Sequence, residues 1–133
     1  MKTENIEHYW PNGHPKWQYI KEDGTIHGEV KRWHENGQLQ GKHIRVHGKY
    51  HGLYQWWHNN GQIAVYCFCH DDKIHGEYKA WGTDGEIRDH RLQINGSMRI
   101  DFLHQPQLYP NTESERLAFM LKYNVRLLPE NTR

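Results

Sequence analysis

The sequence repeats the stretch Gly28-Glu-Val-Lys-Arg-Trp-His-Glu-Asn-Gly-Gln-Leu39 twice, as Gly52-Leu-Tyr-Gln-Trp-Trp-His-Asn-Asn-Gly-Gln-Ile63 and as Gly76-Glu-Tyr-Lys-Ala-Trp-Gly-Thr-Asp-Gly-Glu-Ile87. A degenerate earlier copy runs through Tyr9-Trp-Pro-Asn-Gly13. Equivalent residues lie 24 positions apart. Self-similarity at a fixed period of this length is typical of repeat proteins, in which each repeat is one small structural unit.

Two columns of turn residues divide each repeat into two strands. The first column holds an Asn-Gly or Asp-Gly pair in every copy: Gly13, Gly37, Gly61 and Gly85 with the residue before each. The second column holds Asp23-Gly24, His47-Gly48, Asp71-Asp72 and Asn95-Gly96. Asn-Gly and Asp-Gly tolerate the positive φ angles of a type I′ turn. We therefore predict a type I′ hairpin turn at both columns.

Aromatic and β-branched residues recur between these turns. One column contains Trp33, Trp57 and Trp81, and another contains Val30, Tyr54 and Tyr78. Such residues favour strands, and stacked hairpins bury their apolar faces on their neighbours. We predict a mainly β protein, an elongated single antiparallel sheet of stacked hairpin repeats with a C-terminal capping helix.

The quoted stretches, together with the link Gly48-Lys-Tyr-His-Gly52, resemble the variant form of the MORN repeat found in bacteria and large DNA viruses. The resemblance covers roughly residues 5 to 98. It implies a sheet of successive hairpins that serves as a scaffold or binding surface, with membrane association in some members. The array of about four repeats is assigned to residues 1–98, and residues 99–133 to a last strand, a helix and a tail.

The amino-acid composition limits the class of protein to which the chain can belong. The 133 residues carry a net charge of +1, 35% are hydrophobic and 13% are aromatic. A near-neutral charge argues against disorder, and aromatic side chains compensate for a small aliphatic core. No stretch is apolar enough to span a bilayer, and the amino terminus does not resemble an export signal. The only cysteines, Cys67 and Cys69, stand one residue apart on a predicted strand, so a reducing, cytoplasmic location is expected.

The period is lost after about Ser97, and the next elements are predicted individually. Met98 to Leu103 is expected to form one more strand, and the stretch from Asn111 to Tyr123 a helix. Thr112 and Glu115 make a capping box, and Asn124 can end the helix. An apolar stripe is expected from Leu117, Met120 and Leu121. The helix either caps the sheet or docks on a partner.

Twelve histidines suggest a metal site, but their spacing argues against one. His27, His51 and His75 occupy one column, and His34 and His58 another. Equivalent positions in successive two-stranded repeats lie two strand spacings apart, roughly 9–10 Å, too far to share one ion. We expect these rings to pack or hydrogen-bond locally, or to make assembly sensitive to pH by charging together. Neither a metal nor another cofactor is predicted.

No catalytic constellation is present in the sequence. Glu29 and Glu77 are repeat-related and therefore distant, and no nucleophile elbow or phosphate-binding glycine loop occurs. Arg32, Lys42 and Arg45 alternate with acidic residues, so nucleic acid binding is not favoured. Membrane binding is not favoured either, because no polybasic cluster is present. We do not expect an enzyme.

The expected function is protein binding by a non-catalytic scaffold. The candidate partner-binding residues are aromatic: Trp33, Tyr54, Trp56, Trp57, Tyr78 and Trp81. Trp56 and Trp57 are adjacent, so a strand buried on one face leaves one of them near solvent. The partner is another protein, and open sheet edges also permit self-association. Two narrower roles stay open: an antitoxin that neutralises a toxin, and a structural component of a virion or another large assembly.

Overall fold

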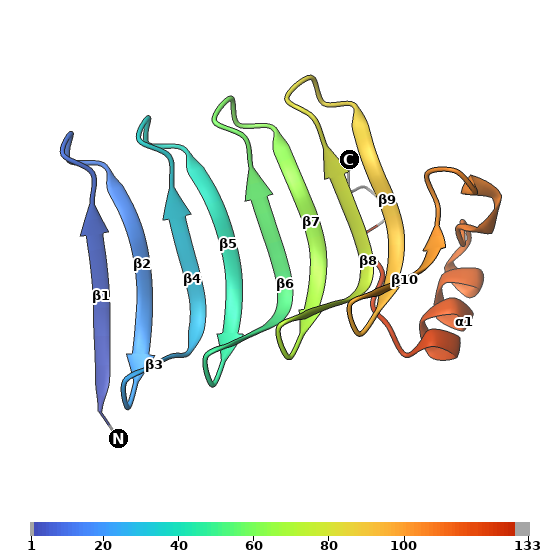
Figure 1. Cartoon of the computed structure of the whole chain (residues 1–133), viewed down its shortest axis with the longest axis horizontal. Helices are drawn as coiled ribbons and strands as arrows, with labels where there is room; N and C mark the ends of the chain where they lie inside the picture. The colour runs from blue at the N-terminus through green and yellow to red at the C-terminus, as the bar shows by residue number, and fades with distance from the viewer. Residues whose placement is uncertain (1, 130–133) are drawn as a thin grey trace.

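The computed structural model describes residues 2–129. Met1 and residues 130–133, the ends of the two predicted regions, lie outside the described part. The chain forms one long antiparallel sheet of ten strands in the order β1-β2-β4-β5-β6-β7-β8-β9-β10, with the short β3 paired to β2 (Figure 1). The strands are β1 (Thr3–Tyr9), β2 (Pro15–Glu22), β3 (Thr25–Ile26), β4 (Gly28–Trp33), β5 (Leu39–Val46), β6 (Lys49–Trp57), β7 (Ile63–His70), β8 (Lys73–Trp81), β9 (Ile87–Ile94) and β10 (Ser97–Asp101). The predicted fold class is confirmed.

The two turn columns adopt different conformations. At the second column both central residues have positive φ, for example 51° at His47 and 82° at Gly48, so the predicted type I′ turns are confirmed. At the first column only the glycine has positive φ, and the type I′ prediction is wrong there. In the loop after β4, the Gly37 N–H donates to the His34 carbonyl, and the His34 N–H donates to the Gln38 carbonyl. This is a three-residue loop with a left-handed glycine, in which asparagine keeps negative φ.

A bulge that contains a His-Gly pair follows each of the first three type I′ turns. Between β5 and β6 the pairing steps from His43↔Tyr54 to Arg45↔Tyr50, which leaves two extra residues on β6. The glycine of the pair, Gly52, has a φ of 92°. Glycine therefore marks the bulge, where the backbone takes a positive φ.

Side chains of the first turn column hold neighbouring repeats together. Nδ2 of Asn60 donates to the Thr83 carbonyl in the following loop at 2.9 Å, and its Oδ1 accepts from the Gln62 N–H at 3.0 Å. Asn12 and Asn36 make the same two bonds. At the last loop the equivalent residue is Asp84, which has no following loop to bond. The amide is thus present only where a next repeat exists.

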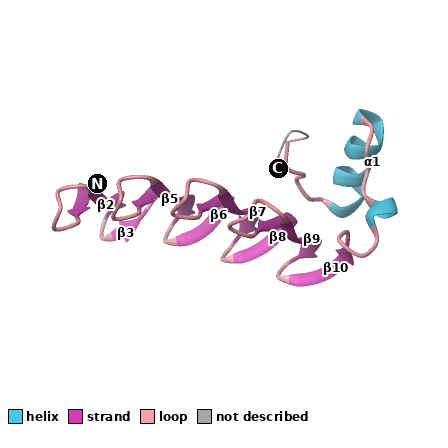
Figure 2. Cartoon of the chain, turned by 90° about the horizontal axis from the view of Figure 1, so that it is seen from above, coloured by secondary structure: helices cyan, strands magenta, loops and turns pink. Residues whose placement is uncertain are grey.

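The C-terminal segment covers one face of the last repeat. It comprises the 3-10 helix η1 (Pro106–Leu108), α1 (Glu113–Tyr123) and an extended tail to Pro129. Figure 2 shows α1 and the tail on one side of the sheet, at the end that carries β9 and β10. The Thr112 side chain accepts the Glu115 N–H, and Asn124 ends the helix in a left-handed conformation, as predicted. The last strand, however, ends at Asp101 instead of Leu103.

The predicted apolar stripe of α1 is wrong. Leu117 and Leu121 are 53% and 83% exposed, whereas Phe119 and Tyr123 pack against the main apolar cluster of Leu92, Phe102 and Val125. The reason lies outside the helix: Arg116 is buried because its guanidinium donates to the Tyr109 hydroxyl and to the Leu128 carbonyl. The tail therefore fixes the rotation of the helix.

Candidate functional site

The strand register assigns each side chain to one of two faces, because directly paired residues point to the same side. The pairs Val30↔His43, His43↔Tyr54, Tyr54↔Cys67, Cys67↔Tyr78 and Tyr78↔Arg91 form one continuous row. We call this side of the sheet the open face. The other side, which includes Phe68, Glu77 and Leu92 and receives the C-terminal segment, is the helix-side face.

The six predicted partner-binding residues divide between the two faces. Tyr54, Trp56 and Tyr78 lie half-buried on the open face. Trp33, Trp57 and Trp81 lie on the helix-side face beside the first turn column, and their carbonyls accept bonds from Trp10, His34 and His58 of the preceding repeats. Trp81 is buried and lines a recess between neighbouring loops together with Gly61 and Ile63. Trp56 and Trp57 thus face opposite ways.

Aromatic rings on the open face stack on one another. The Tyr54 and Trp56 rings are nearly parallel, with centroids 6.3 Å apart. The His43 ring lies 4.7 Å from Tyr50 and 5.7 Å from Tyr54. The Trp56 ring also occupies the space above Gly41, where an added Cβ would lie 2.6 Å from it. The rings are therefore held in place before any partner arrives.

Arginine side chains lie over aromatic rings across the open face. Arg32 lies 4.5 Å from the Trp17 ring, Arg45 4.4 Å from Tyr50 and Arg91 4.4 Å from Tyr78. These cation–π contacts orient the guanidinium groups, which also bond within the sheet. Arg32 donates to the Gln40 side chain, Arg45 donates to the Tyr50 hydroxyl, and Arg91 pairs with Asp89. The open face therefore presents positive charge on an aromatic base.

A shallow groove crosses the middle of the open face. Its volume is about 340 Å³, and it is lined by Tyr50, Tyr54, Val65, Cys67, Cys69, Asp72, Ile74 and Tyr78. Burial raises the pKa of Tyr54 to about 12, and burial with a smaller contribution from Arg45 lowers the pKa of His43 to about 4. Tyr54 in the lining and His43 beside it are neutral near pH 7, so the lining is mostly apolar and aromatic, with the carboxylate of Asp72 beside these side chains.

Cys67 and Cys69 are free thiols on the open face. A hydrogen bond between the two side chains raises the pKa of Cys67, and burial adds to the effect. The same bond lowers the pKa of Cys69. The pairing of β7 with β8 has a bulge between Cys67 and Cys69.

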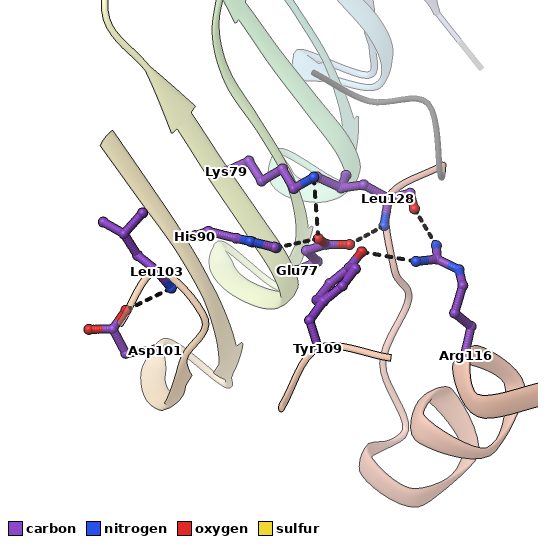
Figure 3. Close-up of polar contacts among 8 residues, drawn as sticks. All are labelled: Glu77, Lys79, His90, Asp101, Leu103, Tyr109, Arg116 and Leu128. Carbon is purple, nitrogen blue, oxygen red and sulfur yellow. Dashed lines mark hydrogen bonds and ion pairs between the residues drawn. The ribbon is translucent and has the colours of Figure 1, made fainter. Parts of the chain in front are cut away.

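The helix-side face holds a buried carboxylate, Glu77, beneath the C-terminal tail (Figure 3). Its Oε1 accepts the Leu128 N–H at 2.7 Å, and its Oε2 lies 2.7 Å from Nε2 of His90 and 4.0 Å from Nζ of Lys79. Burial raises the pKa of Tyr109, whose ring also lies against His90. A carboxylate–imidazole pair is a common acid–base couple. Glu77 has no exposed surface, and its bond to the Leu128 N–H ties the tail to the sheet.

The same side-chain triad occurs uncovered two repeats earlier. Glu29 pairs with Lys31 and Lys42 at 3.4 Å each, and all three side chains are partly exposed. These positions correspond to Glu77, Lys79 and His90. Sequence reasoning treated Glu29 and Glu77 alike and missed the anchoring role of Glu77. The available signal was that the C-terminal segment follows directly after the repeat that contains Glu77.

The comparisons with known proteins bear on this repeat geometry. The family model described as "MORN repeat variant" matches residues 26–44 and 50–68, that is, one hairpin period and the next. The chain carries variant MORN repeats. Each match begins just after a type I′ turn, includes the Asn-Gly loop and ends on the strand that follows this loop. No curated protein and no solved structure matches the chain.

MORN repeats are generally binding motifs for proteins or membranes, and their family is not a catalytic one. In this chain the MORN matches cover β4 to most of β7 and include Tyr54 and Trp56 of the open face. Among the described residues, no helix has both the length and the apolar character that crossing a membrane requires.

Proposed function

We propose that the protein is a non-catalytic scaffold that binds another protein through the open face of its MORN array. One observation carries the proposal: the stacked rings of Tyr54 and Trp56 lie on the face that receives no part of the C-terminal segment. Tyrosine, tryptophan and arginine are the residues that most often supply binding energy at protein interfaces.

The chemistry of the open face indicates what kind of partner it fits. The guanidinium groups of Arg32, Arg45 and Arg91 line it, while Asp89 is already paired with Arg91 at 2.8 Å. A partner with acidic side chains beside apolar ones would pair with the guanidiniums and cover the groove.

Cross-linking from single positions tests which face binds. Tyr54, Gln55 and Trp56 are consecutive on β6, and Gln55 points to the helix-side face. A photoreactive amino acid is placed at each position in turn, and adducts are identified by mass spectrometry from cells that make the protein. The proposal expects one partner joined from positions 54 and 56 but not from 55. Adducts from 55 alone, equal labelling from all three, or none at 54 and 56 refute it.

The identified partner is then purified and titrated against the scaffold. Trp56→Ala should weaken binding by about tenfold or more, because truncation of a central aromatic at an interface costs about 2 kcal/mol. Trp33→Ala, a tryptophan on the other face, is the matched control and should bind like the unsubstituted protein. Affinity should also fall with added salt if the arginines meet acidic groups.

The narrower roles and the location are parts of the same proposal. A toxin as the cross-linked partner would make the protein an antitoxin, and a capsid or other structural subunit would make it an assembly component. The free thiols of Cys67 and Cys69 suit a reducing compartment, and we place the scaffold in the cytoplasm.

A further inference from the structure

The sharpest unassigned cluster of metal-binding side chains lies at the type I′ turn between β7 and β8. His51 from β6 meets His70 and Asp71 there, and one candidate ligand atom from each lies within 4.8 Å of the other two. The His51 and His70 ring centroids are 4.8 Å apart, and Nδ1 of His70 is 4.0 Å from Oδ2 of Asp71. The cluster joins side chains from adjacent strands, whereas equivalent histidines of successive repeats lie two strands apart and do not share an ion.

The two neighbouring repeats provide an internal comparison. The positions of His51, His70 and Asp71 correspond to His27, Val46 and His47 in one repeat, and to His75, Ile94 and Asn95 in the other. Only the middle repeat places three metal-binding side chains together among the described residues. The three repeats therefore share the same backbone arrangement at this turn and differ only in the side chains at these three positions.

Hydrogen bonding also distinguishes His51 from the equivalent histidines of the two neighbouring repeats. Nδ1 of His27 accepts the His47 N–H at 3.2 Å, and Nδ1 of His75 accepts the Asn95 N–H at 3.1 Å. Nε2 of His75 also bonds the Asn124 carbonyl at 2.9 Å. Within residues 2–129 neither nitrogen of His51 makes a hydrogen bond, although the ring is half-buried. Its nitrogens are therefore available to a ligand.

We propose that His51, His70 and Asp71 bind a borderline transition-metal dication, with Zn²⁺ as the representative ion. Two imidazoles and one carboxylate suit Zn²⁺, whereas Mg²⁺ and Ca²⁺ prefer oxygen ligands alone. Ligand atoms around tetrahedral Zn²⁺ stand about 3.3 Å apart at bond lengths near 2.0 Å. The exposed side chains of His70 and Asp71 close the remaining distance by rotation, and Asp72 in the same turn adds negative charge.

The bound ion would tie β6 to the turn that follows β7. The cluster adjoins a groove of about 540 Å³ that is lined by His51 and His70 from the sheet and by Asn124, Val125 and Arg126 from the C-terminal segment. The ion binds the folded arrangement and not the separated strands, so its presence raises the thermal midpoint.

Calorimetric titration of the purified full chain with ZnCl₂, in a buffer that does not bind zinc, tests the site. We expect one saturable site per chain, and about tenfold or greater loss of affinity in His51→Gln, in His70→Gln and in Asp71→Asn. His27→Gln, the equivalent histidine of the preceding repeat, is the matched control and should bind like the unsubstituted protein. Excess MgCl₂ should not compete.

Two further measurements separate the loss of a metal ligand from a loss of folding. In NMR spectra of the imidazole nitrogens, one equivalent of Zn²⁺ should shift the His51 and His70 signals and leave those of His27 in place. The metal-free His70→Gln variant should keep the thermal midpoint of the unsubstituted protein, because His70 is exposed. Binding that survives His70→Gln, shifts at other histidines only, or no saturable binding would overturn the proposal.

Discussion

Removal of the Glu77 carboxylate should release the C-terminal segment from the sheet. Glu77 has no exposed surface, and its two oxygens meet the Leu128 N–H and the His90 ring at 2.7 Å each. Loss of one member of a buried, paired cluster costs about 3–5 kcal/mol, because the remaining polar groups stay buried without a partner. Glu77→Ala should therefore weaken the docking of the tail by about that amount.

Hydrogen exchange measures the docking locally, and urea unfolding measures the whole chain. In Glu77→Ala the Leu128 amide should exchange faster by about two to four powers of ten, since about 1.4 kcal/mol corresponds to a factor of ten. The matched control is Glu29→Ala, which removes the exposed triad with Lys31 and Lys42 and should cost less than about 1 kcal/mol. Equal effects of the two substitutions, or unchanged Leu128 protection in Glu77→Ala, would refute the anchoring role.

Three further predictions use pairs of equivalent positions or a pH titration. Asn60→Asp removes the donor to the Thr83 carbonyl and should lower the free energy of unfolding by about 1–2 kcal/mol, whereas Asp84→Asn at the last loop should change it little; equal effects in urea melts would contradict the loop-to-loop role. Gly76→Ala should destabilise more than Gly28→Ala in thermal melts, because both glycines have positive φ but only at Gly76 would the new Cβ meet the Arg126 carbonyl, at 2.8 Å. Because burial lowers the folded-state pKa of His43 from 6.5 to about 4, the unfolded chain binds the extra proton between these values, and stability should fall as the pH drops from about 6.5 to 4. The slope should be shallower in His43→Gln, and an NMR titration that gives His43 an ordinary pKa would contradict the explanation.

Local sequence signals predicted the hairpin array well, because its turns are chosen by short-range backbone preferences. Asp23-Gly24 and His47-Gly48 adopt the expected positive φ at both residues. The Asn-Gly column was assigned the wrong turn type because the same dipeptide also suits a three-residue loop. The bond from Asn60 to the next repeat does not decide between them, because the Asp84-Gly85 loop has the same geometry without such a bond. The two turns differ in the number of loop residues between the paired strand ends, which the dipeptide alone does not fix.

The candidate surfaces were only partly predictable from the sequence, because they depend on contacts between strands and with the C-terminal segment. Alternation along β6 predicted that Trp56 and Trp57 face opposite ways, but not which face the C-terminal segment would cover. The cluster of His51 with His70 depends on the register between β6 and β7, and periodicity compares each repeat only with its own copies.

The sequence by itself determined the period, the hairpins and the order of the strands, because turn residues and alternating side chains act within a few positions of one another. The tertiary structure alone decided which face stays open, how α1 is rotated and why Glu77 is buried while Glu29 is not. These features depend on where the tail between Val125 and Leu128 returns to the sheet. Its bonds reach about 50 residues back along the chain, as from Leu128 to Glu77, and no local pattern encodes contacts of that range.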